Sequence, residues 1–94
     1  MMATANARHI LVASEEKCEE LKSQIEAGAT DFESCAKKFS QCPSGKKGGD
    51  LGSFGPGQMV KEFDEVVFSG EIGAVLGPVK TQFGYHLIEV TKRS

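Results

Sequence analysis

The stretch SQCPSGKKGGDLGSFGPGQMVKEF, residues 40–63, is the segment around which the rest of the chain is arranged. It holds more than half of the 11 glycines and two of the three prolines, a density that neither a helix nor a long strand tolerates well. A flexible linker would be polar throughout, whereas this stretch repeats apolar side chains: Cys42, Leu51, Phe54, Met59 and Phe63. The pattern predicts a loop that forms the wall of a pocket, with glycines at its sharp turns.

The residues before this stretch predict a strand followed by two helices. The run HILV at 9–12 is apolar and rich in β-branched residues, which is typical of a buried strand. Ser14 is suited to cap a helix that ends near Gly28. The capping-box pattern Thr30-x-x-Glu33 predicts a second helix with Thr30 as its N-cap.

The residues after the stretch predict a third helix and further strands. Apolar residues at helical spacing, beginning with Met59, indicate a helix that stops near Gly70. Gly77-Pro78 opens an extended piece, and YHLIEV at 85–90 is the clearest strand of the sequence. Strands at both ends with helices between them indicate an α+β fold.

The composition is that of one globular domain spanning residues 1–94, with 39% hydrophobic and 26% charged residues. The net charge is −2, and the basic pairs Lys46-Lys47 and Lys92-Arg93 do not make the basic face of a nucleic-acid binder. No segment is long enough to span a bilayer. We therefore expect a monomer with no nucleic-acid or membrane partner.

The cysteines and the first residues together predict a cytoplasmic location. Cys18, Cys35 and Cys42 are odd in number and lack Cys-x-x-Cys spacing, which indicates free thiols in a reducing compartment. Residues 1–7 do not show the apolar run of a secretory signal.

The residues most suited to a chemical role are His9, His86 and Cys42. His9 shares one face of the first strand with Leu11 because side chains alternate along a strand. If the first and last strands are neighbours in the sheet, both histidines can point to the same face and form a hydrogen bond. The alternative is that each histidine is a buried polar side chain satisfied by a neighbour, and that Cys42 is a small packing residue. The spacing alone leaves both alternatives open.

The sequence resembles the parvulin family of peptidyl-prolyl cis–trans isomerases, and is most similar to its small single-domain bacterial members. Five motifs carry the resemblance in the family's order: HILV at 9–12, CPSGKKGGDLG at 42–52, GQMV at 57–60 with Phe63, GPV at 77–79, and QFGYH at 82–86. The resemblance covers residues 9 to 90. It implies a four-stranded antiparallel sheet surrounded by about four helices, a fold of the parvulin/FKBP-like kind.

The resemblance also implies the roles of individual residues. His9 and His86 would be paired histidines at the floor of the site, with Thr81 in their hydrogen-bond network, and Cys42 would be the active-site cysteine. Four further residues would receive the substrate's proline ring or lie at its edge, and a fifth would contact the peptide backbone: Leu51, Met59, Phe63 and Phe83, and Gln58.

The implied function is catalysis of rotation about X–Pro bonds in proline-containing peptides and unfolded proteins, assisting their folding, without cofactor or metal. Rotation needs no covalent step, so Cys42 would act electrostatically. Phosphoserine-directed members carry a basic loop after the first strand, whereas residues 13–16 read ASEE. An acidic connection repels phosphate, which predicts a preference for unphosphorylated peptides.

Three other functions compete with this one. The first is a non-catalytic peptide-binding or chaperone module of the same fold. The second is a zinc site formed by His9, His86 and Cys42, which lacks the usual paired ligand spacing. The third is a cysteine hydrolase using Cys42 and a histidine, for which no orienting group or oxyanion element is recognisable.

Overall fold

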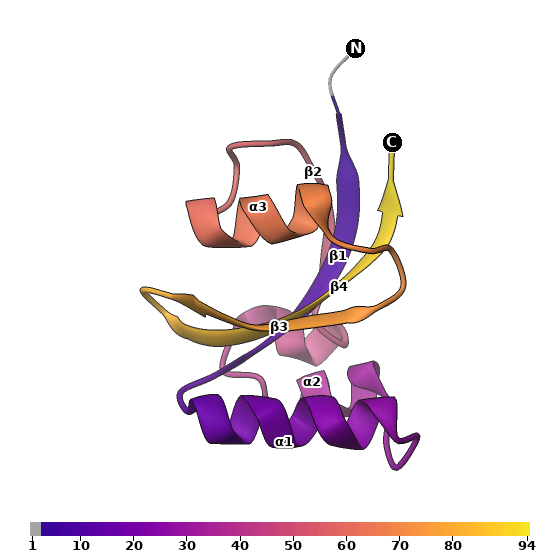
Figure 1. The fold of residues 1–94 in the computed structure, drawn as a ribbon, viewed down its shortest axis with the longest axis vertical. Coiled ribbons are helices and arrows are strands. Elements are labelled where there is room, and N and C mark those ends of the chain that lie inside the picture. The colour runs from indigo at the N-terminus through magenta and orange to yellow at the C-terminus, as the bar shows by residue number, and fades with distance from the viewer. Residues whose placement is uncertain (1–2) are drawn as a thin grey trace.

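A four-stranded antiparallel sheet crosses the middle of the molecule, with α1 and α2 on one face and α3 on the other (Figure 1). The computed structural model describes residues 3–94, so residues 1 and 2 of the predicted domain lie outside the described part. The spatial strand order is β2-β1-β4-β3. The strands are β1 (Ala5–Val12), β2 (Asp50–Phe54), β3 (Val75–Thr81) and β4 (Gly84–Arg93). The helical segments are α1 (Glu15–Glu26), α2 (Phe32–Phe39), the 3-10 helix η1 (Pro43–Lys47) and α3 (Lys61–Ser69).

The predicted α+β class and antiparallel sheet are confirmed, but the expected number of helices is not. Residues 3–94 form three α-helices, and the remaining helical segment, η1, is a short 3-10 helix. Pro43 begins η1, and Gly48 ends it in the left-handed conformation, with φ of 72°. A glycine-rich segment bounded in this way cannot extend into an α-helix.

The register of β1 and β4 divides the interior into two cores. His9 lies opposite Ile88 and Leu11 opposite His86, so these four side chains share the face covered by α3. Ile88 belongs to the core beneath α3. The intervening residues of both strands point to the other face, where they pack with α1 and α2.

The helix boundaries follow local capping. Ser14 caps α1 as expected, because its side chain accepts a hydrogen bond from the Lys17 amide at 3.2 Å. The predicted N-cap of the second helix, Thr30, is wrong by one residue. Asp31 caps α2 by accepting from the Ser34 amide at 2.7 Å. Both residue types can cap a helix, and a carboxylate also favours the positive end of the helix dipole.

The third helix begins later than predicted, at Lys61, so Met59 lies in the preceding loop. Gly49 holds another part of the glycine-rich stretch close to β1. Its φ is 87°, its carbonyl accepts from the His9 amide at 3.0 Å, and a Cβ there would lie 2.3 Å from the His9 carbonyl oxygen. Only glycine fits this approach.

The two ends of the described chain lie side by side (Figure 1). Thr4 and Ser94 exchange main-chain hydrogen bonds of 3.3 and 2.9 Å, which extends the β1–β4 pairing outward. In the described range, none of the helices has both the length and the apolar character needed to cross a bilayer.

Candidate functional site

Two imidazoles are buried together on the sheet face that α3 covers. His9 is 5% exposed and His86 is 4% exposed, and their Nδ1 atoms lie 3.0 Å apart. Phe63, from α3, meets both rings nearly at right angles, with centroids 5.5 Å from His9 and 5.7 Å from His86. The register of β1 and β4 thus brings the two predicted histidines into direct contact.

A hydrogen-bond chain connects this pair to the β3–β4 turn. The Phe83 amide donates to Thr81 Oγ1 at 3.2 Å, and Thr81 Oγ1 lies 2.7 Å from His86 Nε2. The hydroxyl can therefore accept from Phe83 and donate its own hydrogen to His86. In that arrangement His86 donates through Nδ1 to His9, and His9 carries its hydrogen on Nε2. Within residues 3–94, His9 Nε2 is the buried side-chain nitrogen that lacks a hydrogen-bond partner.

Both histidines are neutral at pH 7. Burial, and secondarily the neighbouring His86, lowers the pKa of His9 to about 4. Burial also lowers the pKa of His86. Removing an imidazolium from water is unfavourable, and two adjacent positive charges would repel each other. The pair therefore provides hydrogen bonding rather than positive charge.

Cys42 stands at the start of η1, half-buried and with a free thiol. Ser44 Oγ donates to its sulfur at 3.3 Å. The main chain of residues 40–49 is tied to β1 at two points, where the Gln41 amide donates to the Leu11 carbonyl at 2.7 Å and the His9 amide donates to Gly49. These bonds hold the Cys42 loop beside the strand that carries His9.

A mainly apolar cavity of about 490 Å³ opens over the histidine pair. Eight of the nine predicted site residues line it, and they come from β1, β2, α3, β4 and the loops between the elements: His9, Cys42, Leu51, Gln58, Met59, Phe63, Phe83 and His86. Thr81 is not in the lining and contacts His86 from outside the cavity.

Two lining residues have distinctive local environments. Phe83, in the β3–β4 turn, is 60% exposed, which leaves an aromatic face available to a ligand. Gln58 accepts from the Gly55 amide through Oε1 at 2.8 Å. Its oxygen therefore shapes the loop, and its NH₂ group is the part that remains for a ligand.

Four residues that the sequence did not single out also line the cavity: Leu11, Gln41, Pro43 and Val60. Leu11 could have been found, because strand alternation places it on the same face as His9. The other three adjoin Cys42 or Met59 in sequence, but loop residues have no periodicity that gives their direction.

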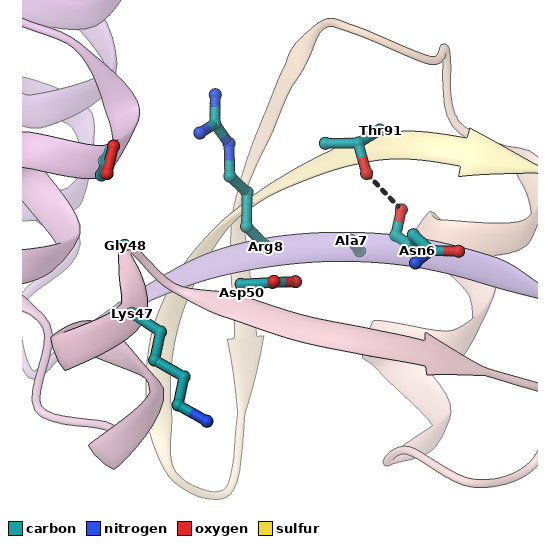
Figure 2. Close-up of a pocket in the computed structure, with 8 residues that line it drawn as sticks. Asn6, Ala7, Arg8, Lys47, Gly48, Asp50 and Thr91 are labelled. Carbon is teal, nitrogen blue, oxygen red and sulfur yellow. Dashed lines mark hydrogen bonds between the residues drawn. The ribbon is translucent and has the colours of Figure 1, made fainter.

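A second, polar hollow of about 330 Å³ lies near η1, β1 and β2 (Figure 2). Its two cations do not converge, since the Arg8 and Lys47 side chains extend in opposite directions (Figure 2). Arg8 is paired with Glu89, and its guanidinium lies 4.9 Å from the centroid of the Phe32 ring. These contacts indicate that Arg8 has a structural role in packing.

The zinc alternative has no set of ligands in residues 3–94. No three histidine, cysteine, aspartate or glutamate side chains cluster there closely enough to hold a metal ion. The Nδ1 atoms of His9 and His86 are instead directed at each other.

Comparisons with known proteins identify the family of this chain and its relatives. A family model described as "Rotamase: PPIC-type PPIASE domain" matches residues 2–92. The "Foldase protein PrsA" of a Geobacillus strain is 50% identical over 88 residues, which cover 93% of this chain and 32% of that protein. The chain spans about a third of the length of the curated relatives it matches.

Solved structures of peptidylprolyl isomerases superpose closely on this chain. The PrsA peptidylprolyl isomerase of Bacillus anthracis superposes with a TM-score of 0.93 at 39% identity, covering 99% of this chain and 43% of that one. NmPin, the parvulin of Nitrosopumilus maritimus, superposes with a TM-score of 0.86 at 33% identity, covering 98% of this chain and 99% of that one.

The relatives overturn the predicted cytoplasmic location. PrsA foldases are extracytoplasmic proteins of Gram-positive bacteria. The prediction was wrong because free cysteines do not identify a compartment. Residues 1–7 also carry no information about a leader in a chain that spans only a third of its relatives.

Proposed function

The chain belongs to the family of PPIC-type peptidyl-prolyl cis–trans isomerase domains, and we propose that it catalyses rotation about X–Pro bonds in unphosphorylated peptides and unfolded proteins, assisting their folding. The observation that carries this proposal is the apolar cavity over the neutral histidine pair. Residues 1–94 act in this proposal as one domain, and as a monomer.

The cavity suits a reaction whose transition state is less polar than its ground state. An X–Pro amide resists rotation because its planar form has C–N double-bond character, with a barrier of roughly 18–20 kcal/mol. Twisting the bond removes this resonance and reduces the polarity of the carbonyl. Water stabilises the planar form more than the twisted one, so a pocket that excludes water favours rotation.

Each lining group has a role in this proposal. Leu51, Met59 and Phe63 receive the proline ring, and Met59 can adjust because its unbranched thioether chain is flexible. Phe83 contacts the peptide at the rim, and the NH₂ group of Gln58 contacts its backbone. His9, His86 and Thr81 maintain the floor of the cavity. No cofactor takes part.

We propose that Cys42 acts electrostatically and not as a nucleophile. A nucleophilic cysteine requires a thiolate, which a nearby imidazolium would promote. Burial lowers the pKa of both His9 and His86, which disfavours an imidazolium in the site at pH 7. A polar sulfur beside the substrate carbonyl can still disfavour the planar, polarised form of the amide.

Variants of Cys42 test this role. We expect Cys42→Ser and Cys42→Asp to retain measurable kcat/KM, reduced by about ten- to 100-fold, because both keep a polar or anionic atom near the carbonyl. Isomerase activity of both variants is measured against wild type, with circular dichroism to establish that each is folded. Complete inactivity of two folded variants would instead support covalent catalysis.

A peptide series tests the function and its specificity. NMR exchange spectroscopy on Ala-Leu-Pro-Phe should show accelerated cis–trans exchange, whereas peptide binding without acceleration would indicate the non-catalytic module. We expect a phosphoserine-proline peptide to be turned over more slowly than its unmodified form. Only residues 13 and 14 separate β1 from α1, and Glu15 and Glu16 then form the acidic first turn of α1. Faster turnover of the phosphopeptide would contradict the proposed preference.

A further inference from the structure

Ser40 lies where three parts of the site meet. It ends α2, with its amide donating to the Ala36 carbonyl at 3.0 Å. It is two residues from Cys42, and its side chain reaches β1 at Leu11. It does not line the cavity, and neither the motifs nor the lining residues of the cavity identify it.

The Ser40 hydroxyl oxygen accepts two main-chain hydrogen bonds. The Leu11 amide donates to it at 3.1 Å, and the Cys42 amide donates at 3.4 Å. The next residue completes the contact, because the Gln41 amide donates to the Leu11 carbonyl at 2.7 Å. One short side chain therefore joins the loop carrying Cys42 to the strand carrying His9.

These bonds take the place of strand pairing along one edge of β1. The pairing of β2 with β1 extends only from Ala5 to Arg8, so the edge of β1 beyond Arg8 has no strand neighbour there. The amide and carbonyl of Leu11 both point to this edge, since the two groups of one strand residue lie on the same side. Ser40 and Gln41 satisfy both of them. Unpaired main-chain groups in a half-buried position would be unfavourable.

We propose that Ser40 is a positioning residue for the isomerase site. Its hydroxyl holds residues 41–43, of which all three line the cavity, at a fixed distance from Leu11 and His9 on the adjoining strand, which line it as well. This inference rests on the proposed function. Alanine at this position removes the acceptor for both amides, so residues 41–43 can move away from β1 and Cys42 loses its fixed place.

The packing around Ser40 allows little compensation. A Cβ at Gly45 would lie 3.0 Å from the Ser40 Cβ and 2.8 Å from the Ala36 carbonyl oxygen. The end of α2, the Ser40 side chain and η1 are thus in close contact. A loop that loses the hydroxyl therefore has little room to shift toward α2, and we expect it to move away from β1 instead.

The test compares Ser40→Ala with wild type in three measurements. We expect faster hydrogen exchange of the Leu11 and Cys42 amides, several-fold faster alkylation of Cys42, and a fall in kcat/KM of roughly tenfold, because small misplacements of a site are costly to catalysis. Alkylation reports on Cys42 because Cys18 and Cys35 are 0% and 2% exposed. Ser53→Ala makes the same chemical change at an exposed position of β2 and should leave all three values unchanged.

A second pair of variants isolates the hydroxyl. Ser40→Thr keeps it and Ser40→Val replaces it with a methyl group of similar size, so Ser40→Thr should exceed Ser40→Val in kcat/KM and in protection of the Leu11 amide. Unchanged kcat/KM in Ser40→Ala, with or without faster exchange, overturns the inference, as does equality of the Thr and Val variants. Absence of isomerase activity in the wild type would refute the proposed function instead. The exchange and alkylation measurements still report on Ser40 in that case.

Discussion

Replacing Phe63 with alanine is expected to lower kcat/KM by at least about 100-fold and the free energy of unfolding by about 3–5 kcal/mol. Phe63 is 3% exposed, packs with Phe54 at a centroid distance of 6.3 Å, and meets both imidazole rings nearly at right angles. It belongs at once to the core beneath α3 and to the cavity lining. Its removal creates a void and admits water to the floor of the site.

A matched control separates the two effects. Val67 lies on the same helix, is 0% exposed and belongs to the same core, but does not line the cavity. We expect Val67→Ala to lose about 2 kcal/mol of stability while its kcat/KM stays within about twofold of wild type. Urea unfolding and isomerase assays at low temperature, where both variants are folded, give the comparison. If folded Phe63→Ala kept wild-type kcat/KM, the proposed proline pocket would be wrong.

Stability is expected to fall by about 3 kcal/mol as the pH decreases from 6.5 to 4, because of His9 alone. The pKa of His9 is about 4 in the folded protein and 6.5 as a free side chain. Between these values the unfolded chain binds a proton that the folded chain excludes. Protonation therefore favours unfolding, and stability rises with pH through this window. The lowered pKa of His86 acts in the same direction.

Urea unfolding at a series of pH values measures this dependence, and NMR titration of the imidazole protons identifies the residue. His9→Gln should reduce the slope of stability against pH between 4 and 6.5, because glutamine does not titrate. A His9 resonance that titrates near 6.5 in the folded protein would contradict the prediction. It would also restore a source of imidazolium for Cys42.

The sequence predicts the parts of this fold that have a regular repeat. The β-branched run at 9–12, the strand at 85–90 and the Ser14 cap are found in the structure. Strand alternation was sufficient to group His9 with Leu11, and to place both histidines on one face once β1 and β4 are neighbours. That adjacency is a long-range pairing, and only the resemblance to a family implied it.

The parts that lack periodicity could not be predicted in the same way. Thr30 and Asp31 are both good caps, and the choice between them depends on tertiary geometry. The directions of Gln41 and Pro43 follow from the hydrogen bonds that Ser40 and Gln41 make to Leu11, which is far away in sequence. The role of Ser40 has the same origin. Side-chain hydrogen bonds to a distant main chain leave no pattern in the local sequence.

The paired ends at Thr4 and Ser94 determine how the domain responds to mechanical force. β1 and β4 are antiparallel neighbours, so tension applied at the two ends acts across their hydrogen bonds and breaks them in succession. The two strands then separate one hydrogen-bonded pair at a time. This requires far less force than sliding two strands past each other along their length, which breaks many hydrogen bonds at once. The first rungs to separate are at the ends, and the pairs that carry His9 and His86 lie several rungs further in. Under a small stretching load the histidine pair at the floor of the cavity is therefore among the last parts of this ladder to separate.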